Sequence, residues 1–205
     1  MGLYDNMKRG FMSLIHPGEE SSGKISIPKA LSIYYPVAVI GLILALVMGY
    51  LSMSHSTALN YSGSYVKTTI LLAAIYLIII PIGIFIDAAI YHLIGKYLLK
   101  AWRGDYSKSF AAYTFVVIPF LSLYWIGEVP VLKIPITGII AVWSIIMVVI
   151  AFASQHKINR TESAVVMIVT MCILLTMAFI VLGFITATAL APLSGGLGSP
   201  MAPIG

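Results

Sequence analysis

The longest apolar stretch of the chain reads KTTILLAAIYLIIIPIGIFIDAAIYHLIGKYLLK and runs from Lys67 to Lys100. About 20 apolar residues allow an α-helix to cross a bilayer, and this stretch is longer than that. Between Lys67 and Lys96 it carries one charged residue, Asp87. The stretch therefore predicts a transmembrane helix with a carboxyl group at a depth where hydrocarbon disfavours charge.

The composition of the whole chain also indicates a membrane protein. Its 205 residues are 60% hydrophobic and only 9% charged, with a mean hydropathy of +1.01. A soluble domain carries about a quarter charged residues, so a water-soluble globule is excluded. The single cysteine cannot form an internal disulfide bond. The net charge of +5 is explained by orientation in the membrane, so we predict no nucleic-acid partner.

Five stretches have the length and hydropathy of spanning helices. None shows the apolar–polar alternation of a β-barrel strand. We therefore predict an all-α, polytopic helical bundle with five transmembrane helices over residues 30–190. Residues 1–29 form a cytoplasmic segment with a short amphipathic helix, and residues 191–205 form an irregular outer tail. The predicted spans cover residues 30–54, 67–100, 109–127, 134–154 and 163–190.

Lysine and arginine residues predict the orientation of the bundle. Cytoplasmic loops of membrane proteins carry an excess of these residues. Ten of the twelve fall in three alternate segments, and the other two are Lys67 and Lys133. The N-terminus is therefore predicted to be cytoplasmic and the C-terminus outside. Basic residues on the inner face should favour anionic lipid headgroups; the candidates are Lys8, Arg9, Lys96, Lys100, Arg103, Lys157 and Arg160.

Two further patterns concern helix packing. Leu3, Met7, Phe11 and Leu14 share one face of the N-terminal segment, which predicts a short helix lying in the inner headgroup plane. In the first span, small residues recur every fourth position and would let two helix backbones approach closely. The partner helix is either another span or a second copy of the chain. These small residues are Gly41, Ala45 and Gly49.

Asp87 lies nine residues before Lys96, or about 13 Å along a helix, in the inner half of the second span. An unpaired charge there costs at least about 2.5 kcal/mol. The carboxyl group is therefore protonated, or accepts a hydrogen bond inside the bundle, for instance from Tyr91, or lines a wet cavity with His92 near its mouth. Asp87, Tyr91 and His92 form the candidate polar site, either as a structural anchor or as a proton or ion relay.

The sequence does not indicate an enzyme. An intramembrane aspartyl protease needs two carboxyl groups, and Asp87 is the only acid within a predicted span. The chain has no HExxH, phosphate-loop or GxSxG motif. The histidines lie in different segments, at His16, His55, His92 and His156. We therefore predict no catalytic residue, no metal site and no cofactor.

The order of features resembles the Yip-one domain family, the Ypt/Rab-GTPase-interacting membrane proteins, in its prokaryotic branch. The resemblance rests on the hydropathy order, the basic loop around Gly104, Pro119 within the third span and the loop around His156. It extends over about residues 11–190 and implies a five-span scaffold that binds partner proteins. The chain lacks the long cytoplasmic N-terminal domain of the eukaryotic members, so the resemblance does not carry GTPase binding over to it.

Three functional hypotheses follow. The first is a non-enzymatic scaffold or a partner- or lipid-binding protein with a role in membrane organisation or trafficking, which forms homo-oligomers. The second is a small transporter or ion-permeable protein that uses Asp87. The third is a subunit of a larger membrane complex, which the short loops would suit. All three make the chain an integral multi-pass protein, in the cell membrane if the organism is a prokaryote.

Overall fold

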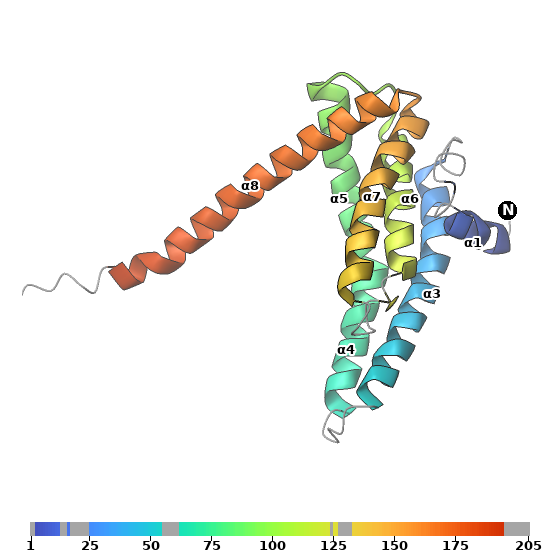
Figure 1. Ribbon diagram of the computed structural model, residues 1–205, viewed down its shortest axis with the longest axis vertical. Helices are drawn as coiled ribbons and strands as arrows, with labels where there is room; N and C mark the ends of the chain where they lie inside the picture. Colours follow the sequence, from blue (N-terminus) through green and yellow to red (C-terminus); the bar gives the residue numbers. More distant parts are fainter. Residues whose placement is uncertain are drawn as a thin grey trace, which may run out of the picture. The chain divides into compact units, whose positions relative to one another are not determined.

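Every regular element in the described part of the chain is a helix (Figure 1). The structure is a computed structural model that describes residues 3–12, 16, 25–54, 62–123, 125–126 and 133–194. The chain divides into two compact units, residues 1–167 and 168–205. The predicted all-α class is confirmed.

Four helical segments of the described residues are long and apolar enough to cross a membrane. Three correspond to α3 (Ile27–Ser54), α7 (Lys133–His156) and α8 (Arg160–Ser194), and the fourth runs from α4 to η2. The chain is therefore an integral multi-pass membrane protein. The helix boundaries differ from the predicted ones by a few residues: α3 begins at residue 27 rather than 30, and α8 continues to residue 194.

The third predicted span, α6 (Tyr106–Leu123), is not one of these four segments. It has 18 residues and includes Lys108 and several hydroxyl side chains. Helix α6 lies between α3 and α7 (Figure 1), a position in which polar side chains can be buried against protein. Three of its hydroxyl side chains are buried in protein, namely Ser109, Thr114 and Ser122.

Helix α6 separates two hydrophobic cores of the first unit. Tyr34 of α3 and Ile84 of α5 pack with Phe110 and Phe115 on one side. On the other side, Ala112 and Val116 contact residues of α7, the end of α5 and the start of α8. Both faces of α6 are thus occupied by protein, which makes α6 the element that holds the first unit together.

The second predicted span is a continuous helical path in which two stretches have the wider π-helical turn. The first stretch precedes Pro81, which has no N–H to donate. Within it, the N–H of Ile80 bonds the carbonyl of Ile75, five residues earlier. The Tyr34 hydroxyl donates to the carbonyl of Tyr76, at 2.5 Å, and so joins α3 to this turn. The path consists of α4 (Ser62–Ala74), η1 (Ile75–Ile79), α5 (Ile80–Leu93) and η2 (Ile94–Leu98).

The N-terminal helix α1 (Leu3–Met12) rests on the bundle. Gly10 of α1 is buried, and a Cβ atom built on it would lie 2.6 Å from the Val37 side chain of α3. Phe11, which was predicted to lie on the apolar face, remains 37% exposed. At Gly10, therefore, the missing side chain leaves room for side chains of α3 and α6 to pack against α1.

The predicted small-residue stripe of α3 has two different environments. Gly41 lies against the backbone of α6, and a Cβ atom built on it would be 2.6 Å from the Leu121 carbonyl oxygen. Ala45 is buried. Gly49 has no described heavy atom within 4 Å of its Cβ position. At Gly41, therefore, the neighbouring backbone belongs to another helix of the same chain.

We expect Gly41→Ala to lower the free energy of unfolding by about 1–3 kcal/mol, because the obstacle is a backbone carbonyl that cannot rotate away. Gly49→Ala is the matched control. It should raise stability by up to about 1 kcal/mol, since alanine is the better helix former and meets no obstacle. Unfolding of the two variants in mixed detergent micelles measures both effects. Equal stabilities for the two variants would contradict the close α3–α6 contact.

Candidate functional site

The carboxyl group of Asp87 in α5 is held by a residue of the neighbouring helix. The hydroxyl of Tyr113 in α6 donates to Asp87 Oδ2 at 2.8 Å. The buried ring of Tyr91 lies 5.7 Å from the Tyr113 ring and 5.3 Å from that of Phe152 in α7. Tyr113 therefore supplies the hydrogen bond for which the sequence suggested Tyr91 as donor.

One turn further along, two histidines share one serine hydroxyl. Ser109 Oγ of α6 lies 2.9 Å from His92 Nδ1 of α5 and 3.0 Å from His156 Nε2 of α7. All three residues are buried. A hydroxyl can donate one hydrogen bond and accept another, so two neutral imidazoles in linked tautomers satisfy this arrangement. His92 is thus buried and, through Ser109, linked to helices α6 and α7.

The indole ring of Trp102 packs against His156 of this pair. It stacks on the His156 ring at 4.5 Å between centroids and on the Phe152 ring at 4.7 Å. Its other contact is Gly95 of η2, where a Cβ atom would clash with the indole ring. The backbone N–H of Trp102 donates to the Gly95 carbonyl at 3.1 Å, and this bond turns the loop back onto the end of η2. Trp102 is 4% exposed and belongs to the core.

The serine–histidine contact resembles, in distance alone, a nucleophile beside its base. Ser109 is completely buried, so a substrate could not reach its Oγ without opening the bundle. The hydroxyl is also shared with a second imidazole. The described residues also contain no group of three His, Cys, Asp or Glu side chains placed to hold a metal ion. The arrangement can pass a proton between two rings, and it ties α5, α6 and α7 together.

Basic side chains surround this buried cluster at the end where η2 and α7 terminate. Lys96 Nζ donates to the Gly104 carbonyl at 3.1 Å and so supports the loop that leads to α6. A pocket of about 580 Å³ lies between this loop and the one that joins α7 to α8. We call it the basic pocket; its lining includes Lys100, Arg103, Lys157, Asn159 and Glu162.

Lys100 and Lys157 share an uncommon backbone conformation. Their φ angles are +52° and +53°, and each residue directly follows or nearly follows a helix end. Glycine or asparagine is the usual residue in such a left-handed position, where an L side chain costs about 1–2 kcal/mol. The chain thus places a lysine at two positions where the backbone favours another residue.

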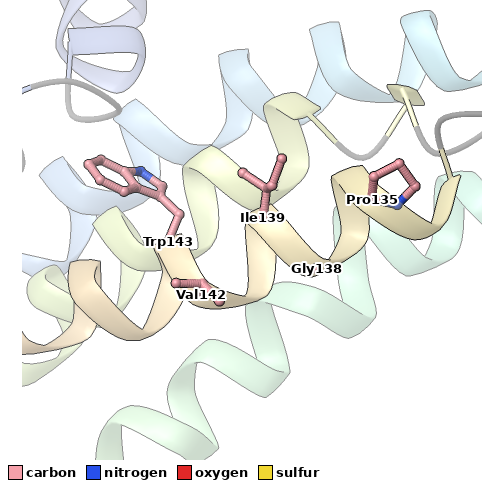
Figure 2. Close-up of a pocket in the computed structure, with 5 residues that line it drawn as sticks. All are labelled: Pro135, Gly138, Ile139, Val142 and Trp143. Atoms are coloured by element: carbon pink, nitrogen blue, oxygen red, sulfur yellow. The ribbon is translucent and has the colours of Figure 1, made fainter.

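A second pocket, of about 440 Å³, runs along α7 alone. Figure 2 shows its lining, in which the Trp143 ring extends along the helix and Gly138 leaves a gap between larger side chains. The lining side chains are apolar and include no charged group that could fix a polar ligand. This groove therefore suits lipid chains or another apolar surface; it is lined by Pro135, Gly138, Ile139, Val142 and Trp143.

The structure brings together only some of the predicted site residues. Asp87 and Tyr91 lie near Tyr113, whereas His92 belongs to the cluster with Ser109 and His156. Of the predicted inner-face basic residues, three line the basic pocket, and Lys8 and Arg9 lie on α1. Sequence reasoning missed Tyr113, Ser109 and Trp102, because an ordinary tyrosine, serine or loop tryptophan carries no signal of its partner.

The comparison with protein families agrees with the resemblance in the sequence. The family model described as the Yip1 domain matches residues 11–183. This range includes α3 to α7 and both polar clusters, but leaves out most of α1. No curated protein and no solved structure matches the chain.

Proposed function

Because the chain belongs to the Yip1 domain family, we propose that it is a non-enzymatic multi-pass membrane protein that organises membranes by binding partners and lipids. The observation that carries this proposal is how the intramembrane polar groups are used. Asp87, His92 and His156 each bond a side chain of α6. Polar groups in these roles fix the packing of a rigid scaffold.

The proposed scaffold has five spans, with the N-terminus in the cytoplasm. The basic pocket joins the loop after η2 to the loop after α7, so these two helices end on the same side. Helix α7 is long enough to cross the membrane, and it can return to that side only if α6 has crossed before it. The collected basic residues support a cytoplasmic assignment for this side, in the cell membrane of a prokaryote.

Self-association of the full-length protein tests the scaffold role. Donor- and acceptor-labelled protein is reconstituted into liposomes over a range of protein-to-lipid ratios. We expect energy transfer that rises with this ratio, exceeds that of randomly mixed monomers and falls when unlabelled protein is added. Energy transfer at the random level throughout would contradict self-association.

Gly49 is the residue we propose for the contact between copies, because no described atom lies near its Cβ position. Gly49→Leu should then lower the energy transfer without lowering stability. Gly83→Leu is the matched control, since the Cβ position of Gly83 in α5 is equally open. Equal changes in energy transfer for the two substitutions would show that the contact between copies does not involve Gly49.

A second candidate function is proton or ion permeation through Asp87. The observation in its favour is that Asp87 is only partly buried, and that Tyr113 can exchange a proton with it. This function requires a pH-dependent flux that Asp87→Asn abolishes. As a third candidate, a role as one subunit of a larger membrane complex requires co-purification with other membrane proteins at a fixed stoichiometry.

A further inference from the structure

We propose that the basic pocket binds the phosphate of an anionic lipid headgroup. This inference deepens the lipid-binding part of the proposed function and rests on it. Three cationic side chains, Lys100, Arg103 and Lys157, line the pocket together with one carboxylate, Glu162. Within the described residues, no ion pair within 4 Å joins Glu162 to any of these cations. The pocket therefore has an excess of positive charge available to a ligand.

The two loops that supply these cations lie close together, although they are more than 50 residues apart in the sequence. Two lysines in a left-handed backbone conformation place one cation on each loop. Backbone conformations of this kind persist where the surrounding structure over-determines them, and they collect at ligand sites. Asparagine or glycine would relieve the backbone at both positions and would remove both charges.

The base of the pocket is rigid, which suits a preformed site. Ala101 lines the pocket, and its N–H donates to the Gly95 carbonyl at 2.9 Å. The next residue, Trp102, is stacked on Phe152 and His156. On the other loop, the side chain of Asn159 accepts a hydrogen bond from the N–H of Thr161. The loops therefore need little ordering when a ligand binds.

The chemistry of the pocket favours phosphate. The guanidinium of Arg103 can bond two phosphate oxygens at once, and lysines add point charges. A volume of about 580 Å³ lies within the range of small-ligand sites. Tyr97, which is 63% exposed at the end of η2, is an aromatic residue of the kind that anchors at headgroup level. A lipid headgroup is therefore the expected source of the phosphate, rather than a free phosphate compound.

The test measures binding of short-chain lipids to the purified full-length protein in detergent micelles. The probes are dihexanoyl phosphatidic acid, dihexanoyl phosphatidylcholine and inorganic phosphate. Wild type should bind phosphatidic acid more tightly than phosphatidylcholine. Lys100→Asn with Lys157→Asn should weaken phosphatidic acid binding about 25-fold, at about fivefold for each lysine. The matched control is Lys24→Gln with Lys29→Gln, which removes equal charge from the same predicted face and should weaken phosphatidic acid binding less than about twofold.

The outcomes separate the source of the phosphate from the site itself. Tight binding of inorganic phosphate that the pocket variant loses would support the phosphate chemistry and assign a free compound as ligand. Equal losses in the pocket variant and its control, or no preference for phosphatidic acid, would overturn the proposal. The two lysines could instead stabilise the negative C-terminal ends of the helices that they follow. Their removal would then change stability and leave phosphatidic acid binding unaltered, which would also overturn the proposal.

A single substitution keeps the test valid if the asparagine variant folds poorly. Arg103→Gln leaves both left-handed residues in place and should weaken phosphatidic acid binding about fivefold. Unchanged binding by this variant would count against the pocket. Because the measurement uses protein in detergent without partners, its failure would leave the self-association result, and with it the scaffold role, unaffected.

Discussion

Trp102→Ala is expected to lower the free energy of unfolding by about 3–5 kcal/mol, the largest effect of any substitution considered for this protein. The indole is buried against Gly95 of η2 and against Phe152 and His156 of α7, so its removal leaves a cavity between these two elements. It also removes the ring that stacks on His156, one of the two hydrogen-bond partners of Ser109. Equilibrium unfolding of the purified protein in mixed micelles measures the loss.

Trp143→Ala is the matched control for the loss of an indole. Trp143 is only partly buried and borders the open groove on α7. Its removal should lower the free energy of unfolding by at most about 1.5 kcal/mol, because less of this ring than of the Trp102 ring is buried. Similar losses for the two variants would show that Trp102 does not have the buried position described above.

Ser109→Ala is expected to lower the free energy of unfolding by about 2–4 kcal/mol. The substitution removes one hydroxyl but takes a partner from two buried imidazole nitrogens, and each such group costs about 1–3 kcal/mol. Adding His156→Phe should recover part of the loss, because phenylalanine keeps the aromatic stack and needs no hydrogen bond. The same unfolding measurement applies.

Ser122→Ala separates this effect from the general loss of a hydroxyl in α6. Ser122 is also buried, but its hydroxyl donates to the Ile118 carbonyl within its own helix. That carbonyl belongs to the helical hydrogen-bond ladder, so the expected cost is about 0.5 kcal/mol or less. A Ser109→Ala variant as stable as Ser122→Ala would show that the link between the two histidines contributes nothing.

The helices could be predicted because their signal is local. An apolar run such as the one around Asp87 specifies a spanning helix by its length alone, and the membrane leaves few other structures possible. Helix α6 was the partial exception. Because α6 packs against protein on two sides, its sequence includes Lys108 and buried hydroxyl groups. These residues lower its mean hydropathy below that of the other spans.

The polar contacts could be predicted only in part, because they join residues that are far apart in the sequence. An isolated acid at membrane depth implies a partner, but Tyr113 is 26 residues away from Asp87. His92 and His156 were both predicted near the inner membrane face, yet no spacing rule indicated that one serine would link them. The stacking of Trp102 on His156 could not be predicted either, because it joins residues 54 positions apart.

Proton and ion flux in liposomes decides between packing and permeation as the role of the intramembrane polar residues. Wild type, Asp87→Asn and a control, Asp105→Asn in the loop before α6, are reconstituted and exposed to a pH gradient and to salt gradients. If these residues serve packing, we expect no flux above that of empty liposomes for any of the three proteins, and altered stability in Asp87→Asn. A pH-dependent flux through wild type and Asp105→Asn that Asp87→Asn abolishes would contradict a packing role.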